Sequence, residues 1–284
     1  PSQTAVTDRM AVLLEVPPRR RPVTDSGRAL ISGCVITYQE ADRIADCIRS
    51  LSFCDEVVVV DSGSSDGTQA IAEELGARVI SNAPFPGHRQ QKQFAIEQAR
   101  NDWVFCLDAD ERCTEPLQVM VRELQANGFG ADAYEMPRLN HYLGRILKHG
   151  LHVPDRKLRL FDRRKGVWGG RNPHDHVEMS DGAARGRLGA GIEHLSYRDF
   201  AHHRRTADSF SRIAAAAMAA EGRRANLLDL LVRPPAVFLK SLLLKLGFLD
   251  GWRGFAVAMM AAYTDWKKYW RLMWSKRPVV EDAT

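Results

Sequence analysis

The sequence lacks the features that mark membrane-spanning, disulfide-linked and zinc-binding proteins. It has five cysteines in 284 residues, and none of them stands in a CxxC pair. We therefore expect reduced cysteines in a cytosolic protein rather than a disulfide framework or a zinc site. No run reaches 18 uncharged apolar residues, which argues against a spanning helix. The first residues also lack the basic, apolar and small-residue order of a signal peptide.

Charge is distributed unevenly along the chain. The composition is ordinary for a globular protein, with 45% hydrophobic and 26% charged residues and a formal net charge of +5. Residues 29–136 carry 8 basic and 18 acidic side chains, whereas residues 137–284 carry 27 basic and 14 acidic ones. A basic second half favours an anionic partner, such as membrane headgroups, a phosphorylated substrate or a nucleic acid. The alternative is a solvated surface whose charge serves no partner.

Short apolar runs alternate with segments of helical periodicity in residues 29–136. Strands are predicted at 32–38, 56–60, 77–81 and 103–107, and helices at 40–51, 68–75 and 88–100. This alternation is typical of an α/β fold with a mainly parallel sheet flanked by helices, in which ligands bind at the carboxyl ends of the strands. Short strands are expected near 133–136, 157–161 and 191–194, and residues 206–274 are almost all helical in pattern. We divide the chain into a flexible tail (1–28), a sheet domain (29–200) and a helical extension (201–284).

Acidic residues follow two of the predicted buried strands. Asp108 and Asp110 come directly after the strand at 103–107 and could bind a divalent cation. Mg²⁺ usually takes one or two carboxylates together with substrate phosphates, so this pair suits a nucleoside diphosphate. Asp61 ends the strand at 56–60 and could accept hydrogen bonds from a base or ribose. The alternative for each is an ordinary polar turn that caps the next helix. Neither GxGxxG nor GxxxxGK[ST] is present.

Three segments taken together resemble the nucleotide-sugar half of glycosyltransferase family 2. They read ITYQEADRI (36–44), EVVVVDSGSSDGT (56–68) and WVFCLDADE (103–111), with a basic, glutamine-rich segment at 88–100 between the last two. The match looks closest to the branch that acts on lipopolysaccharide core, including glucosyl- and heptosyl-transferring enzymes. Gln39 is a departure, since the family usually has asparagine there.

The resemblance implies a GT-A fold with a catalytic domain at 29–200, of which 29–136 would bind the nucleotide sugar and 137–200 the acceptor. It implies a nucleotide-diphosphate donor, expected to be a UDP-hexose, and inversion at the anomeric carbon. Asp110 and Asp108 would bind Mg²⁺ or Mn²⁺ with the diphosphate. The candidate contacts to nucleotide, phosphate or acceptor are Thr37, Tyr38, Glu40, Asp61, Ser62, Gly63, Lys92, Asp108 and Arg171, with Arg89, Arg156 and Arg159 as further basic candidates.

The general base is expected in the polar segment 168–178, where relatives often carry V-H-E. Asp175 is our first candidate and Glu178 its rival. The base would take the proton of the acceptor hydroxyl as that oxygen attacks opposite the leaving diphosphate, in a single displacement. His174 and His176 could bind metal or phosphate, although an HxH pair without further ligands in spacing gives little support for zinc.

Tryptophan and basic residues recur together near the C-terminus. Trp266, Trp270 and Trp274 are spaced by four residues, beside Lys267, Lys268 and Arg271. Such a stripe favours helices that lie on a membrane surface. The alternative is a helical subdomain packed on the catalytic core or on a second subunit of a homo-oligomer.

We therefore predict a peripheral enzyme on the inner, cytoplasmic face of the cytoplasmic membrane, acting on a lipopolysaccharide core or another lipid-linked acceptor. A nucleotidyltransferase is a competing interpretation, but it would have a glycine-rich basic loop after the first strand. A catalytically silent, nucleotide-binding membrane adaptor of the same fold is another. Nucleic-acid binding is not expected, because the aromatic residues of the basic half alternate with aliphatic ones at helical spacing and form no base-stacking platform.

Overall fold

The computed structural model describes residues 28–171 and 174–275, without the side chains of Arg171 and His174. The predicted tail up to residue 27, Asn172, Pro173 and the last residues of the extension lie outside the described residues. The chain divides into two compact units. The first holds the described residues up to Leu139 together with Asp155–His194. The second joins Asn140–Pro154 to the residues from Leu195 onward, a grouping that no local sequence pattern predicts.

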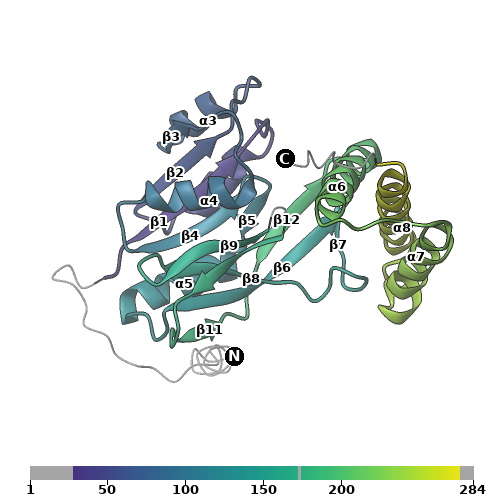
Figure 1. Ribbon diagram of the computed structural model, residues 1–284. Helices are drawn as coiled ribbons and strands as arrows, with labels where there is room; N and C mark the ends of the chain where they lie inside the picture. The colour runs from purple at the N-terminus through teal and green to yellow at the C-terminus, as the bar shows by residue number, and fades with distance from the viewer. Residues whose placement is uncertain (1–27, 172–173, 276–284) are drawn as a thin grey trace, which may run out of the picture. The chain divides into compact units, whose positions relative to one another are not determined.

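Four parallel strands form the centre of the first unit (Figure 1). They are β1 (Ile31–Thr37), β2 (Glu56–Asp61), β3 (Arg78–Ser81) and β4 (Trp103–Asp108), in the order β3-β2-β1-β4. Their cores are continuous apolar runs, as expected for strands covered on both faces. In the register, Thr37 lies beside Asp61 and Ile36 beside Asp108. The predicted acidic strand ends therefore meet at one edge of the sheet.

Antiparallel strands extend the sheet beyond β4. The strand β8 (Arg156–Asp162) pairs with β4, and β6 (Ala133–Tyr142) pairs with β8. The path continues through β12 (Ile192–Tyr197) to β5 (Glu111–Cys113), while β11 (Arg185–Arg187) pairs with β6. The strands expected near 133, 157 and 191 are confirmed. A separate two-stranded sheet of β9 (Gly166–Arg171) and β10 (His174–Met179) was not predicted.

Helices cover both faces of the parallel strands, because successive strand residues point to opposite sides. Val35, Val59 and Phe105 pack in one apolar cluster with residues of α2 (Ile44–Ser50) and α5 (Glu115–Asn127), and α3 (Thr68–Glu74) adds Ala72 to it. Cys34, Val58 and Val104 pack in the other with α4 (His88–Glu97), which crosses the strands in Figure 1. The helix expected from residue 40 begins later, at Ile44, and α5 was not predicted. All five cysteines are free.

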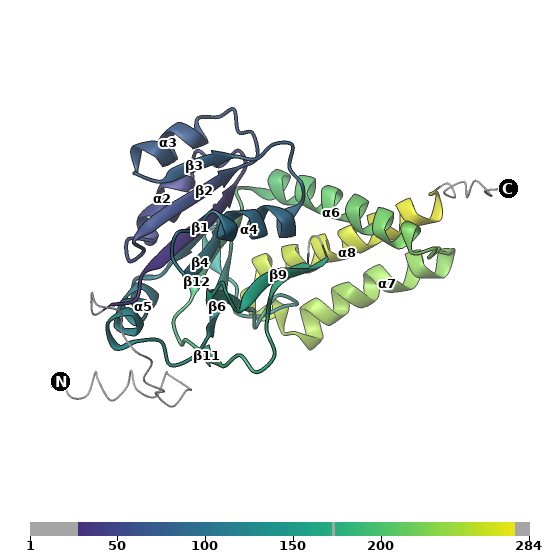
Figure 2. The same ribbon diagram turned by 60° about the vertical axis from the view of Figure 1, so that its left-hand side comes forward.

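The second unit is mainly helical, as the sequence predicts. Its helices α6 (Phe200–Ala220), α7 (Leu227–Leu239) and α8 (Trp252–Met273) lie side by side in both views (Figure 2). A π-helical turn (Lys240–Leu244) and a 3-10 turn (Gly247–Asp250) connect α7 to α8, and the short strand β7 (Arg145–Ile146) pairs with the end of β6. The Asp208 carboxylate accepts hydrogen bonds from Tyr263 and Arg271, which joins α6 to α8. None of the helices in the described residues is long and apolar enough to cross a membrane.

Candidate functional site

Asp61 shapes the loop that follows β2. Its side chain is fully buried, and Oδ1 accepts hydrogen bonds from the backbone N–H groups of Gly63 (2.8 Å) and Ser64 (2.7 Å). Gln69 donates to the same oxygen at 2.7 Å. Gly63 has φ +92°, a conformation that glycine adopts without steric cost. Asp61 and Gly63 thus hold the loop in one shape, and their contact with a nucleoside stays a prediction.

Gln91 fixes the same loop from the other side. It is fully buried on α4, where its Nε2 donates to Ser62 Oγ at 3.0 Å and its Oε1 accepts from Asn82 Nδ2 at 2.8 Å. The loops after β2 and β3 are therefore both attached to α4 by a single side chain. Ser62 is held in place at the edge of the sheet, where the sequence predicted a nucleotide contact.

The predicted nucleotide residues at the end of β1 and just after it lie at the same edge. Thr37 is 4% exposed, and its Oγ1 is buried without a hydrogen-bond partner among the described residues. Tyr38 is largely exposed, and the Glu40 carboxylate lies 3.7 Å from Arg43 Nε. A buried hydroxyl without a partner is costly, so a ligand group at this edge would satisfy it.

Gln39, between Tyr38 and Glu40, occupies a strained backbone position. Its φ is +57°, in the left-handed region that asparagine adopts far more readily than glutamine. We expect Gln39→Asn to raise the free energy of unfolding by about 0.5 kcal/mol, because asparagine adopts this conformation with less strain. Gln39→Val should lower it by about 1 kcal/mol, since β-branched residues rarely adopt this conformation. Urea denaturation of both variants measures the difference, and an equal midpoint for the two would contradict the argument.

A buried ammonium joins two of the predicted acidic residues. Lys92 Nζ on α4 lies 3.0 Å from Asp108 Oδ1 and 2.9 Å from Asp175 Oδ2. The side chains of Lys92 and Asp175 are 9% and 6% exposed. Burial alone would lower the pKa of Lys92, but the carboxylates of Asp108 and Asp175 raise it above its usual value. The structure therefore brings three predicted site residues together, with the lysine charged.

A second cation contacts Asp108. Arg159 on β8 is buried, and its Nη2 lies 3.1 Å from Asp108 Oδ2 and 2.7 Å from both carboxylate oxygens of Glu111. Burial would raise the pKa of Asp108, but Lys92 and Arg159 hold it well below its usual range. Arg159 was predicted only as a possible phosphate or acceptor contact. Glu111 was not singled out, although it completes this network.

Asp175 and Glu178 point to opposite sides of β10. Asp175 lies on the side of Val177, which is buried in the core cluster beneath α4. Glu178 is 55% exposed and folds back over the hairpin, where it accepts a hydrogen bond from the backbone N–H of Gly170 at 3.1 Å. His176 Nε2 lies 3.4 Å from Glu178 Oε1. The structure thus places Asp175, but not Glu178, beside Lys92. Arg171 ends β9, and its side chain is not among those described.

Asp110 faces a histidine that the sequence did not indicate. Its Oδ2 lies 3.4 Å from His194 Nε2, because β12 pairs with β5 and sets His194 opposite Glu111. Burial alone would raise the pKa of Asp110, but the charge and hydrogen bond of His194 lower it. A carboxylate and an imidazole at this separation can both ligate one divalent ion.

The donor set suits a metal ion that arrives with its substrate. Within residues 28–171 and 174–275, no group of three or more His, Cys, Asp or Glu side chains could hold a metal ion. Asp108 has two cationic partners, Lys92 and Arg159, and its place at the metal stays a prediction. Asp110 and His194 lie close enough to each other to supply two donors. Two protein ligands fit an ion that also takes phosphate oxygens and water, as Mg²⁺ does in many phosphate-transfer sites.

Comparison with known proteins gives consistent matches. The model for glycosyl transferase family 2 matches residues 32–180. The chain is 30% identical over 272 residues to "Lipopolysaccharide core biosynthesis glycosyltransferase LpsC" of Rhizobium meliloti (strain 1021), covering 89% of this chain and 97% of that protein. It is 30% identical over 252 residues to an uncharacterized glycosyltransferase of Rickettsia typhi (strain ATCC VR-144 / Wilmington), covering 82% and 83%.

Solved structures show weaker likenesses. The S. aureus TarS 1-349 structure in complex with UDP is 14% identical, with a TM-score of 0.45, and the match covers 86% of this chain and 90% of that one. Glucosyl-3-phosphoglycerate synthase from Mycobacterium tuberculosis, in complex with Mn²⁺, UDP and glucosyl-3-phosphoglycerate, is 23% identical with a TM-score of 0.33. That match covers 44% of this chain and 52% of the synthase.

Proposed function

The chain belongs to glycosyltransferase family 2 and has its GT-A fold, and on that premise we propose that it transfers a sugar, with inversion, from a nucleotide-diphosphate donor to a glycan acceptor. UDP-hexose is the expected donor, and a lipopolysaccharide core or another lipid-linked glycan the expected acceptor. The observation that carries the proposal is that Lys92 forms ion pairs with both Asp108 and Asp175 at the carboxyl end of β4. In α/β sheets, ligands bind at that edge.

Asp175 is the proposed general base. Its carboxylate accepts the proton of the acceptor hydroxyl while the hydroxyl oxygen forms a bond to the anomeric carbon. The bond from that carbon to the donor diphosphate breaks in the same step, and its electron pair leaves with the diphosphate. Lys92, 2.9 Å from Asp175 Oδ2, orients the carboxylate. Since the displacement is direct, no covalent sugar–enzyme intermediate forms.

Lys92 and Arg159 have a second proposed role, toward the leaving group. Both are buried cations beside Asp108, where the diphosphate would bind. Negative charge grows on the diphosphate as the glycosidic bond breaks. Fixed positive charges in a site of low water content stabilise that charge more strongly than they would in water.

Asp110 and His194 would hold the divalent ion with the diphosphate. The ion would act as a Lewis acid that offsets the charge of the departing phosphates. An imidazole ligand is less suited to Mg²⁺, which prefers oxygen donors, so we propose Mn²⁺ as the better match for this pair.

Donor binding tests the proposed function directly. We expect one of UDP, GDP, ADP and CMP, titrated by calorimetry, to bind tightly with Mn²⁺ and weakly with EDTA, and we expect that nucleotide to be UDP. Tight binding of a different diphosphate would change the donor but keep the reaction class. If no nucleotide binds under either condition, the proposed reaction is wrong.

An exposed apolar surface on the second unit supports the proposed membrane association. On α7, the two turns after it and the start of α8, large apolar side chains are between 46% and 79% exposed. We call this set the apolar patch: Leu227, Leu228, Leu231, Val232, Leu239, Leu243, Leu244, Leu246, Phe248, Leu249, Trp252 and Phe255. A patch of this kind is unusual on a protein surface that faces only water.

Basic side chains accompany the apolar patch. Residues 222–259 contain six basic and two acidic side chains, and the exposed basic ones include Arg224, Lys240 and Lys245. Of the predicted tryptophan stripe, Trp266 and Trp270 lie on α8, and Trp274 follows its last residue. The rings of Trp266 and Trp270 stack, with their centroids 5.7 Å apart. Apolar residues bordered by cations fit a bilayer with anionic headgroups. We propose that this surface binds the inner face of the cytoplasmic membrane.

We expect the double variant Leu231→Glu/Leu244→Glu to lose membrane binding. Flotation with vesicles of phosphatidylglycerol and phosphatidylethanolamine should show a bound fraction lower by about tenfold or more, because two side chains that are 62% and 79% exposed would no longer insert. The matched control is Val119→Glu, which places a charge on an exposed apolar position of α5. Equal flotation of the wild type, the double variant and the control would contradict the proposal. If the wild type is a dimer and the double variant a monomer, the apolar patch binds a second copy of the chain instead.

A further inference from the structure

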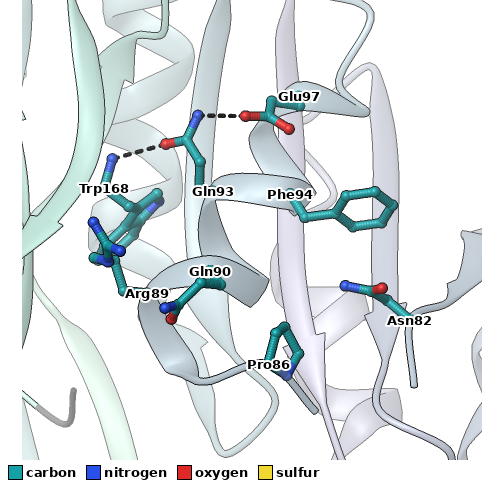
Figure 3. A pocket seen from close by; sticks show the side chains of 8 residues that line it. All are labelled: Asn82, Pro86, Arg89, Gln90, Gln93, Phe94, Glu97 and Trp168. Carbon is teal, nitrogen blue, oxygen red and sulfur yellow. Dashed lines mark hydrogen bonds between the residues drawn. The ribbon is translucent and has the colours of Figure 1, made fainter. Parts of the chain in front are cut away.

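A cavity of about 380 Å³ opens on the outer side of α4 (Figure 3). The residues that line it come from α4, the loop after β3 and the strand β9. They are Asn82, Pro86, Arg89, Gln90, Gln93, Phe94, Glu97 and Trp168. The buried side of the same helix carries Gln91 and Lys92, which serve the site described above. The cavity is therefore separate from the proposed reaction centre but shares a helix with it.

Several polar groups of the cavity are already held in place. Gln93 Oε1 accepts a hydrogen bond from the backbone N–H of Trp168 at 2.9 Å, and Gln93 Nε2 donates to Glu97 Oε1 at 2.9 Å. Asn82 Nδ2 donates to Gln91 Oε1 at 2.8 Å. Ligand sites are typically built from a few polar groups whose positions are fixed before the ligand arrives.

Trp168 carries a buried polar group that no described residue satisfies. The residue is 5% exposed, and its indole Nε1 is buried without a hydrogen-bond partner among the described residues. Buried tryptophan N–H groups usually find an acceptor, and leaving one unpaired costs free energy. The same ring lies 4.8 Å from Lys92 Nζ. The residue that lines the cavity thus also contacts the lysine of the reaction centre.

The lining has the chemistry that recognises a sugar ring. Amide side chains both donate to and accept from hydroxyl groups, and three of the lining residues are amides. Arg89 and Glu97 carry opposite charges, which offset each other and give no preference for an anion. Phe94 and Pro86 offer apolar surface for the C–H face of a ring. The volume lies at the lower end of the range for small-molecule sites.

We propose that this cavity binds a neutral sugar residue of the acceptor glycan, at a position other than the hydroxyl that is glycosylated. The sugar lies against the wall that Trp168 forms, so its binding changes the surroundings of the buried indole. That the sugar belongs to an acceptor rests on the proposed function; that the cavity binds a sugar does not. Binding of a sugar to the cavity can be measured without donor, metal or turnover.

The indole N–H signals of the six tryptophans provide the test, in ¹H–¹⁵N correlation spectra of the whole chain. Trp168→Phe identifies the Trp168 signal and retains an aromatic ring. We expect methyl glucoside, methyl mannoside or N-acetylglucosamine, titrated to 100 mM, to shift that signal saturably. In Gln90→Leu the dissociation constant should rise about three- to tenfold, the effect of one neutral hydrogen bond. Glu74→Leu, on the exposed side of α3, should leave it unchanged.

Three outcomes would overturn the inference. They are no shift of the Trp168 signal with any of these sugars, an equal shift with inorganic phosphate, and an unchanged dissociation constant in Gln90→Leu. A titration with UDP and Mn²⁺ on the same sample reports donor binding separately. A sample that binds UDP but no sugar refutes the cavity assignment alone, whereas one that binds sugar but no nucleotide refutes the proposed reaction alone.

Discussion

Turnover in the Asp175→Asn variant is expected to fall by about 10²- to 10⁴-fold, the usual contribution of a positioned general base. Asparagine keeps an oxygen that can accept a hydrogen bond from Lys92, and Lys92 retains its second carboxylate partner, Asp108. We therefore expect the variant to fold and to bind the donor with an unchanged dissociation constant. Initial rates with saturating donor and acceptor, together with donor calorimetry, measure the two effects separately.

Glu178→Gln is the matched control for this variant, because it removes the rival carboxylate from the other side of the same strand. Glu178 is exposed and bound to the hairpin backbone, so we expect turnover within about twofold of the wild type. A large loss in Glu178→Gln together with a small one in Asp175→Asn would show that Glu178 is the base. In that case the hairpin would have to rearrange when the acceptor binds.

Asp110→Asn should weaken metal-dependent nucleotide binding and turnover by at least about 10²-fold. An amide is a poorer ligand than a carboxylate for a hard divalent ion, and even indirect partners of metal ligands change affinity by about 10- to 100-fold. Calorimetry of UDP with Mn²⁺ should show the loss, while the weak binding in EDTA should match that of the wild type. Unchanged binding with Mn²⁺ would rule out Asp110 as a metal ligand.

His194 and Asp110 are expected to act as one unit. His194→Ala should also weaken Mn²⁺-dependent binding, and the double variant should lose little more than Asp110→Asn alone, because residues that share a ligand are not additive. The control is Asp181→Asn, which removes an exposed carboxylate of the same unit, in a turn before β11. It should change neither Mn²⁺-dependent nucleotide binding nor turnover. Additive losses in the double variant would mean that the two residues bind different groups.

Local patterns were sufficient to predict the parallel part of the fold. Val57–Val60 and Trp103–Leu107 are continuous apolar runs, and Ile44 and Ile48 are spaced as on one side of a helix. These signals depend on residues near one another in the chain. The order of strands along the sheet then placed Asp61 and Asp108 at one edge, because parallel strands end together.

The remaining residues of the site depend on pairing between distant segments. His194 lies beside Asp110 only because β12 pairs with the three-residue strand β5, and so short a strand leaves no periodic signal. The Glu111–Arg159 pair likewise joins residues 48 positions apart. The strands β9 and β10 contain many glycines and polar residues, so their sequence shows no regular alternation of apolar and polar residues. In the structure, Trp168 and Val177 are paired neighbours on the buried side of this hairpin.

The two sides of β10 differ in what they would offer to a substrate. Val177 lies next to Trp168 in the antiparallel register, and both are buried. A slip of one residue between these strands would turn every side chain of β10 to the other side. Asp175 would then face solvent, and the histidine-bearing side would face Lys92. The apolar pair at 168 and 177 therefore selects which functional group meets the lysine, so a mutation that loosens this packing would change chemistry before it unfolds the protein.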